Sequence, residues 1–159
     1  MIDKENVKVR LVGEKDIPVM IAHRLAYLTE MQGERSPEYM QNLSIELSEY
    51  FRSHIQSGGF FALVAEAKGQ ILGYGAMVLR SVPGDLNKPF YLEGDILNMY
   101  TLPHARKKGV GTIILEQLLD KARSLGLSKV GLHTSADGEH LYRSNGFNEP
   151  VFPYLELVL

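Results

Sequence analysis

The sequence predicts one α/β domain spanning residues 1–159, with a mixed, mostly antiparallel twisted sheet and helices on both faces. Three observations carry this prediction. Two long segments between residues 16 and 56 have apolar residues at helical spacing. Short apolar segments bounded by turn residues, typical of strands, recur from residue 60 onward. A strand, a helix and a further strand then follow one another near residues 90–134, which predicts one parallel pair because such crossovers join parallel strands.

The N-terminal third reads as a strand and two helices. Apolar residues alternate with cations over residues 7–12, which indicates a half-buried strand. A helix should follow to about residue 31, with Asp16 as its N-cap. A break at 33–37 separates it from a second helix over 38–56, whose apolar stripe is Tyr39, Leu43, Leu47, Tyr50, Phe51 and Ile55.

The remaining chain supplies most of the sheet. Residues 60–67 and 71–80 flank a short Lys-Gly-Gln turn and predict an antiparallel hairpin. After a turn-rich loop, residues 90–101 should form the central strand, followed by a helix over 112–125 that ends at a glycine. The further expected elements are a strand over 130–134 parallel to the central one, a short helix over 137–145 and a final strand over 154–159.

Composition excludes several classes of protein. A net charge of −2 argues against a general nucleic-acid binder, and the absence of cysteine excludes disulfides, thiolate metal sites and a cysteine nucleophile. The five histidines show no metal-ligand spacing, so no metal is expected. No apolar run is long enough to cross a membrane, and the polar stretch 1–6 lacks the core of a signal peptide. We therefore expect a cytoplasmic protein.

One basic turn has the properties of an anion-binding site. Residues 106–112 read Arg-Lys-Lys-Gly-Val-Gly-Thr and lie between the central strand and the next helix. The first N–H groups of a helix have no partner inside the helix, and its dipole adds positive charge there. Glycines at 109 and 111 remove the Cβ atoms that would keep a phosphate at a distance. The turn therefore predicts a pyrophosphate ligand, although a solvated surface loop explains the same residues.

Two motifs connect this turn with a known family. The strand end 98–103 followed by Arg106-x-x-Gly109-x-Gly111 resembles the Q/R-x-x-G-x-G/A acyl-CoA motif of the GCN5-related N-acetyltransferases, the GNAT superfamily. Downstream, the stretch GEHLYRSNGF resembles the family's short helix with a tyrosine, followed by Gly-Phe. From residue 60 onward the chain follows the family's layout. The resemblance implies a GNAT-like sheet whose central parallel strand pair splays apart to hold acyl-CoA.

The resemblance also implies cofactor-binding residues for acetyl-CoA as acetyl donor. The 106–112 turn would hold the pyrophosphate, while backbone groups at the end of the central strand would pair with the pantetheine arm and the acetyl carbonyl. Ser135 stands where relatives often carry a pantetheine-binding asparagine, and its shorter hydroxyl could serve the same purpose. The residues concerned are Met99, Tyr100, Thr101, Arg106, Lys107, Lys108, Gly109, Val110, Gly111, Thr112 and Ser135.

Acetyl transfer to an amine also needs a proton donor and a base. Tyr142 occupies the position of the family's tyrosine acid, which would protonate the leaving thiolate, although it could instead serve only packing. For the base we favour Glu93 on the central strand, with His133 as the alternative because histidine ordinarily titrates near pH 6.5. Asn98 lies near the bend, where many relatives carry an acidic residue, and its neutral amide cannot act as a base.

The sequence therefore predicts an N-acetyltransferase that moves acetyl directly from acetyl-CoA to a primary amine on a small molecule or a peptide. The polar interhelix segment offers Glu30, Gln32, Glu34 and Arg35 as contacts for this acceptor. A noncatalytic acyl-CoA sensor or partner-binding module on the same fold is the main alternative, and a nucleotide-phosphate binder is a weaker one. Exposed strand edges would also allow a homodimer by strand addition.

Overall fold

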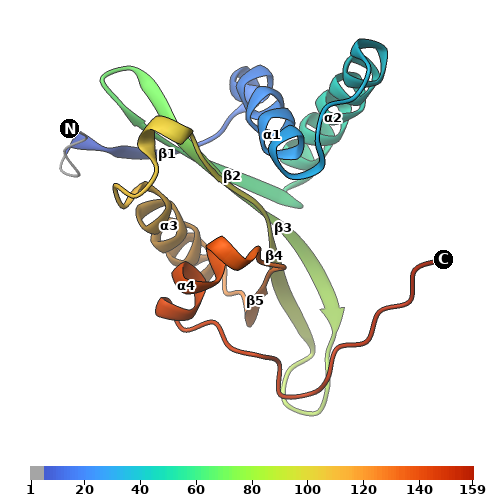
Figure 1. Cartoon of the computed structure of the whole chain (residues 1–159). Coiled ribbons are helices and arrows are strands. Elements are labelled where there is room, and N and C mark those ends of the chain that lie inside the picture. Colours follow the sequence, from blue (N-terminus) through green and yellow to red (C-terminus); the bar gives the residue numbers. More distant parts are fainter. Residues whose placement is uncertain (1–5) are drawn as a thin grey trace.

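The computed structural model describes residues 6–159. Residues 1–5, part of the polar stretch in which we expect no signal peptide, lie outside the described residues. Four α-helices and five strands are present within 6–159 (Figure 1). The helices are α1 (Ile17–Gln32), α2 (Pro37–Ser57), α3 (Val110–Ser124) and α4 (Ala136–Ser144). The strands are β1 (Lys8–Leu11), β2 (Phe60–Ala67), β3 (Gln70–Pro83), β4 (Phe90–Thr101) and β5 (Lys129–Gly131).

The five strands of this part of the chain form one sheet in the order β1-β2-β3-β4-β5. The first three pairings are antiparallel, whereas β4 and β5 are parallel. The predicted hairpin and the parallel pair are therefore confirmed. The sequence prediction that residues 90–101 form the central strand is wrong, because β3 occupies the middle of the sheet and β4 lies next to the edge strand β5.

Helices cover both faces of the sheet, as predicted (Figure 1). On one face, α1 and α2 bury Met20 and Phe51 against Val64 and Tyr74 of the sheet. On the other face, α3 buries side chains such as Ile114 against the opposite sides of the same strands, and α4 adds Tyr142 to this cluster. Removing these apolar surfaces from water is the main favourable contribution to folding.

Glycines within β3 let α3 lie unusually close to the sheet. A Cβ at Gly75 would come within 2.7 Å of Ile114 Cγ2 and of the Met99 sulfur. Such a distance is shorter than van der Waals contact, so any other residue would push the helix or the strand away. The close packing fixes the N-terminus of α3 relative to β4, and the candidate site depends on this placement.

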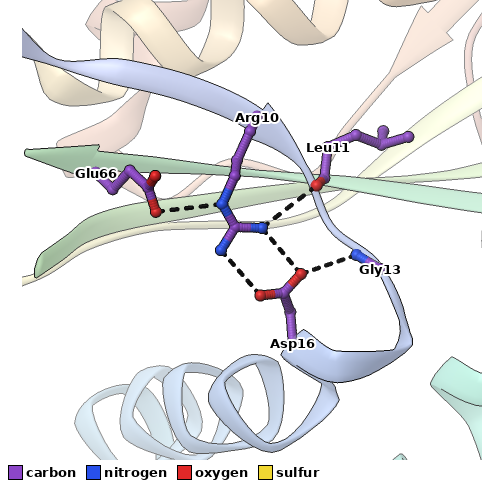
Figure 2. A network of polar contacts seen from close by, with 5 residues as sticks. All are labelled: Arg10, Leu11, Gly13, Asp16 and Glu66. Carbon is purple, nitrogen blue, oxygen red and sulfur yellow. Dashed lines mark hydrogen bonds and ion pairs between the residues drawn. The ribbon is translucent and has the colours of Figure 1, made fainter. Parts of the chain in front are cut away.

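A charged network joins β1 to the start of α1 (Figure 2). Arg10 donates to both carboxylate oxygens of Asp16 at 2.9 Å and to Glu66 on β2 at 3.2 Å. Asp16 is only 8% exposed and also accepts a hydrogen bond from the Gly13 N–H. Asp16 occupies the N-cap position of α1, as predicted, but its carboxylate makes no hydrogen bond to the first turn of that helix in the described chain. The carboxylate accepts hydrogen bonds from Arg10 instead.

A β-bulge in β4 and the short pairing of β5 open the sheet. Ala76 pairs with Asn98 and Met77 pairs with Ile96, so Leu97 is an extra residue on β4. Such a bulge bends the strand and increases its twist. Pairing between β4 and β5 extends only from Glu93–Lys129 to Asp95–Gly131. Along the β5-facing edge, the C-terminal half of β4 therefore has no neighbouring strand among the described residues.

The structure corrects three further predictions. The strand expected over 130–134 is shorter and begins earlier, at Lys129, because the chain leaves the sheet after Gly131. The final strand expected over 154–159 does not form within the described chain, and its large apolar side chains are 70–109% exposed. Tyr39, expected in the apolar stripe of α2, is 56% exposed, because the first turn of that helix projects beyond the sheet.

Candidate functional site

A cleft of about 140 Å³ lies where β4 and β5 diverge. We call it the β4–β5 cleft. It collects residues from α1, from β4, from the start of α3 and from the continuous stretch 132–142 that follows β5 and includes most of α4, so four parts of the chain meet there. Its lining consists of Tyr27, Ile96, Leu97, Asn98, Met99, Thr101, Gly111, Leu132, His133, Thr134, Ser135, Gly138, Leu141 and Tyr142.

The basic turn lies at one end of this cleft, and α3 begins within it. Gly109 is the N-cap of α3 with φ of 80°, and no side chain of the described chain caps that helix end. Lys107 also has a positive φ, 58°, so the turn passes through left-handed conformations before the helix starts. Gly111 lines the cleft, and a Cβ added there would meet Thr101 Oγ1 only at 3.6 Å. The cleft therefore borders the uncapped N–H groups at the start of α3, where an anion is favoured.

The cationic side chains of the turn are only partly available for a ligand. Arg106 donates to the Thr101 carbonyl at 3.0 Å and to Glu30 Oε2 at 2.7 Å, and its guanidinium lies 5.5 Å from the centre of the Tyr100 ring. Lys108 Nζ donates to the His104 carbonyl at 2.7 Å. Arg106 thus links the turn to Glu30 near the C-terminal end of α1. To contact a phosphate, its guanidinium would have to break one of its hydrogen bonds to Glu30 or Thr101.

Tyr142 projects from α4 into the core beside the cleft. It is 8% exposed and packs edge-on against Phe147 with ring centres 5.7 Å apart. Burial, with a smaller contribution from neighbouring Tyr27, raises the pKa of Tyr142 to about 12. The hydroxyl therefore stays protonated at neutral pH and acts as a hydrogen-bond donor.

Asn98 is a buried amide on the wall of the cleft. It is 3% exposed, and neither its Nδ2 nor its Oδ1 has a hydrogen-bond partner among residues 6–159. Buried polar groups without partners are uncommon and call for an explanation. A ligand or a water molecule in the cleft would supply the missing partner.

The end of β4, where the sequence predicts backbone contacts with a cofactor, borders the cleft. Met99 and Thr101 line the cleft, whereas the Tyr100 side chain points to the opposite face and packs near His23 and Tyr27. Only the backbone of Tyr100 is therefore available on the β5 side of the strand, in keeping with the backbone role expected for it.

Two further predicted residues follow β5. Ser135 is the N-cap residue of α4 and lines the cleft, and its hydroxyl does not cap that helix in the part of the chain described. His133 also lines the cleft and lies 6.4 Å, between ring centres, from Tyr154. Both side chains are exposed, so they are accessible to a ligand.

Glu93 lies elsewhere. It pairs with Arg80 at 2.7 Å and with Lys129 at 3.2 Å, at the closed end of the β4–β5 pair, and it is not part of the cleft lining. Its role as base stays a prediction, and the geometry gives that role no support. The structure places His133, the alternative, inside the cleft.

Tyr27, which α1 contributes to the cleft, is not among the residues predicted from the sequence. A signal for it exists, because His23, Tyr27 and Glu30 recur at helical spacing on one face of α1. All three turn toward the end of β4: His23 and Tyr27 lie 6.3 Å from Tyr100 between ring centres, and Glu30 pairs with Arg106. Burial lowers the pKa of His23, so its ring is neutral at physiological pH.

Comparison with known proteins identifies the family that this fold and cleft define. The model of the acetyltransferase (GNAT) family matches residues 25–147, well over half of the chain, so the chain belongs to this family. A curated relative, an IAA acetyltransferase of Azospirillum brasilense, is 34% identical over 97 residues. That alignment covers 58% of each protein, so the chain matches less than two thirds of this relative's length.

Solved structures support the same fold. A predicted acetyltransferase with acetyl-CoA from Clostridium acetobutylicum is 26% identical with a TM-score of 0.83, and the match covers 96% of both chains. A GCN5-related N-acetyltransferase from Ralstonia eutropha is 20% identical with a TM-score of 0.78, over 95% of this chain and 98% of the other. At that identity the second comparison shows the fold alone.

Residues 6–159 contain neither a recognisable metal site nor a membrane-spanning helix. No cluster of three or more histidine or acidic side chains suited to a metal ion was found there. No helix in the same range is both long enough and apolar enough to cross a membrane.

Proposed function

We propose that this protein is an N-acetyltransferase that moves acetyl from acetyl-CoA to a primary amine by direct transfer, with Tyr142 as general acid. The observation that carries the proposal is the β4–β5 cleft, in which an uncapped helix N-terminus, an unpaired strand edge and a buried tyrosine hydroxyl meet. The acetyl-CoA of the Clostridium acetobutylicum structure supports this donor.

The residues of the cleft suit acetyl-CoA part by part. The 106–112 turn offers N–H groups and cations for the pyrophosphate. The unpaired edge of β4 from Met99 to Thr101 offers backbone groups to the amides of the pantetheine arm, much as an added strand would. The side-chain amide of Asn98 lacks hydrogen-bond partners, and the Ser135 hydroxyl does not cap α4. Both groups can therefore form hydrogen bonds with the pantetheine arm.

The chemistry then needs one nucleophile and two proton transfers. The acceptor nitrogen, once neutral, attacks the acetyl carbonyl carbon, the C–N bond forms, and the C–S bond breaks with its electron pair going to sulfur. The ammonium proton passes to a base, for which His133 is the best-placed titratable group on the cleft wall. The product is an acetylated amine and free coenzyme A.

Tyr142 acts at the departing sulfur. A phenol with a pKa of about 12 is a weaker acid than a thiol, whose reference pKa is about 8.5. Tyr142 therefore stabilises the developing thiolate first by donating a hydrogen bond, and any proton that it releases must be returned to it from solvent or from the base. Stabilising charge that develops only in the transition state raises kcat rather than affinity.

Two matched pairs of variants test the two halves of the proposal. Gly111→Ala places a methyl group in the cleft and should weaken acetyl-CoA binding about tenfold or more by calorimetry, whereas Gly13→Ala, with open space around it, should not. Tyr142→Phe should lower amine-dependent thiol release about 10²- to 10⁴-fold with acetyl-CoA affinity retained. Tyr91→Phe, at the start of β4 and hydrogen-bonded to Asp85 of the preceding loop, is its control.

The outcomes separate the proposal from its rivals. If both the wild-type protein and the Tyr142→Phe variant fold and bind acetyl-CoA, but neither releases thiol with any amine tested, the protein is a noncatalytic acyl-CoA sensor. Displacement of acetyl-CoA by ATP from one shared site would favour a nucleotide-phosphate binder. The acceptor class, a small-molecule or a peptide amine, is decided by which amines increase thiol release.

A further inference from the structure

Polar groups without partners gather on the face of the sheet that α1 covers. Within residues 6–159, the buried side-chain nitrogen and oxygen atoms that lack a hydrogen-bond partner all belong to His23, Tyr74 and Asn98. Tyr74 on β3 pairs with Tyr100 on β4, so both side chains point to one face, and Asn98 shares that face two residues earlier. The His23 ring lies 6.3 Å from the Tyr100 ring between ring centres. We call His23, Tyr74 and Asn98 the polar cluster. Buried polar groups are normally paired, so three of them in one region mark a candidate binding site.

Arg24 brings a positive charge to this region and has no anionic partner. It lies one helical turn after Met20, which is fully buried, so it belongs to the inner face of α1. Its side chain is partly buried, and within residues 6–159 it takes part in no hydrogen bond or ion pair. Burial raises the pKa of Tyr74, and the charge of Arg24 offsets part of this effect, so the guanidinium acts on that hydroxyl. An arginine on the inner face of a helix ordinarily has a paired anion.

We propose that the acceptor amine also carries a carboxylate, which Arg24 binds on the α1 side of the β4–β5 cleft with the polar cluster behind it. This inference rests on the proposed acetyl transfer, because it names the acceptor class of that reaction. Tyr27, one turn after Arg24 on α1, lines the cleft, and so does Asn98 of the polar cluster. These two residues therefore connect the Arg24 region with the place where acetyl is delivered.

The groups beside Arg24 suit an anion that only accepts hydrogen bonds. The Tyr74 hydroxyl is protonated and can donate, and the neutral His23 ring carries one N–H. A carboxylate accepts from such donors and can also take two parallel hydrogen bonds from one guanidinium. A phosphate group carries up to two charges and would need a second cation, whereas no lysine or arginine lines the cleft in the described part of the chain. The single free cation therefore favours a carboxylate.

The position of Arg24 separates it from the proposed pyrophosphate site. Glu30, which pairs with Arg106 of the 106–112 turn, lies six residues further along α1. At 1.5 Å per residue, this distance is about 9 Å along the helix axis. Arg24 is thus available to the acceptor, while the turn holds the cofactor. Because no hydrogen bond holds the guanidinium, it can move to admit a carboxylate and then close over it.

Matched pairs of acceptors test the carboxylate requirement. The common L-amino acids, β-alanine and γ-aminobutyrate would each be compared with the corresponding amide, which keeps the amine and removes the negative charge. With saturating acetyl-CoA, kcat/KM for thiol release should be at least about tenfold higher for the carboxylate of each reactive pair. The amide has the less basic amine, so amine basicity alone would favour the amide and cannot produce this preference.

Variants at the site should remove the preference without altering the chemistry. Arg24→Gln removes the charge, so KM for the carboxylate should rise about 10- to 100-fold while kcat, and KM for the amide, stay nearly unchanged. Tyr74→Phe removes only a hydroxyl and should raise KM for the carboxylate about three- to tenfold. Arg52→Gln, at an exposed position of α2, is the matched control and should behave as the wild type. A general loss of structure would affect both acceptors of a pair equally.

The outcomes distinguish failure of this inference from failure of the proposed function. Thiol release that is as fast with amides as with carboxylates, or a preference that survives Arg24→Gln, overturns the carboxylate site while acetyl transfer stands. If no amine releases thiol, the proposed function fails, and calorimetry with the same carboxylates in the presence of coenzyme A tests the site. Binding that is lost in Arg24→Gln supports the site, whereas no binding, or binding unchanged in that variant, overturns it.

Discussion

Arg106 Nη2 lies 2.7 Å from Glu30 Oε2, so the turn that precedes α3 is ion-paired to the C-terminal end of α1. The guanidinium also holds the Thr101 carbonyl and faces the Tyr100 ring. One side chain therefore connects the 106–112 turn, the open end of β4 and the helix that contributes Tyr27 to the cleft. A pyrophosphate bound at the turn, as proposed, would compete with Glu30 for Arg106, because both anions attract the same cation.

Glu30→Gln should strengthen acetyl-CoA binding a few-fold. The substitution removes a negative charge next to the anion site and leaves Arg106 held by the Thr101 carbonyl. Calorimetric titration with acetyl-CoA at low salt measures the change, which should shrink as salt screens this exposed pair. Glu34→Gln, in the same segment but outside the ion pair, should have no effect. Weaker binding by Glu30→Gln would show that the carboxylate positions the turn rather than competing with the ligand.

The pH dependence of turnover should identify the base. If His133 accepts the amine proton, kcat falls toward low pH because a base acts only in its unprotonated form, and His133→Gln lowers kcat while flattening this acidic limb. No alkaline limb should arise from Tyr142 below about pH 10, because burial raises the pKa of that acid to about 12. His140→Gln, on the exposed side of α4, is the matched control. An acidic limb that survives His133→Gln but disappears in Glu93→Gln would restore Glu93 as the base.

Asn98→Leu should stabilise the fold while impairing the site. The buried amide has no protein partner among the described residues, so replacing it with an apolar side chain of similar size removes an unsatisfied group worth about 1–2 kcal/mol. For a domain of this size, the melting temperature should rise by about 2–8 °C. Acetyl-CoA affinity or kcat should fall in the same variant, because the ligand loses its amide partner. A variant that is more stable and fully active would mean that Asn98 has no role in binding.

Asp16→Asn should destabilise the protein by about 2 kcal/mol, which is a fall in melting temperature of about 4–8 °C. The hydrogen bonds from Arg10 lower the pKa of Asp16 below its usual value. A carboxyl group with a lowered folded-state pKa stabilises the fold above its unfolded pKa of about 3.9, and this contribution is lost as pH falls through the folded value. Urea unfolding at pH 7 should therefore separate wild type from variant, and the difference should shrink below about pH 4. Asp120→Asn, in an exposed pair on α3, provides the control.

Local patterns in the sequence determined most of the fold. The spacing of apolar residues predicted the bounds of α2, β2 and β4 to within a residue or two. This was possible because such spacing involves only residues that are near one another in the sequence. The same holds for the 106–112 turn, where two glycines and a following helix specify a local backbone conformation. Gly111 of this turn and Tyr142 line one cleft because both motifs follow strands of a parallel pair, whose carboxyl ends lie at one edge of the sheet.

Only the tertiary structure decided the remaining features, because they depend on pairing between distant segments. The bulge at Leu97 is visible only in the register of β4 against β3, and the ion pairs that hold Glu93 away from the cleft depend on where Arg80 and Lys129 fall beside it. Tyr27 lines the cleft because α1 crosses the end of β4, and the helical spacing of His23, Tyr27 and Glu30 indicates their shared face but not what that face contacts. The apolar period of residues 154–159 likewise indicates a strand, but strand formation depends on pairing with a distant segment, and within the described residues this segment pairs with none.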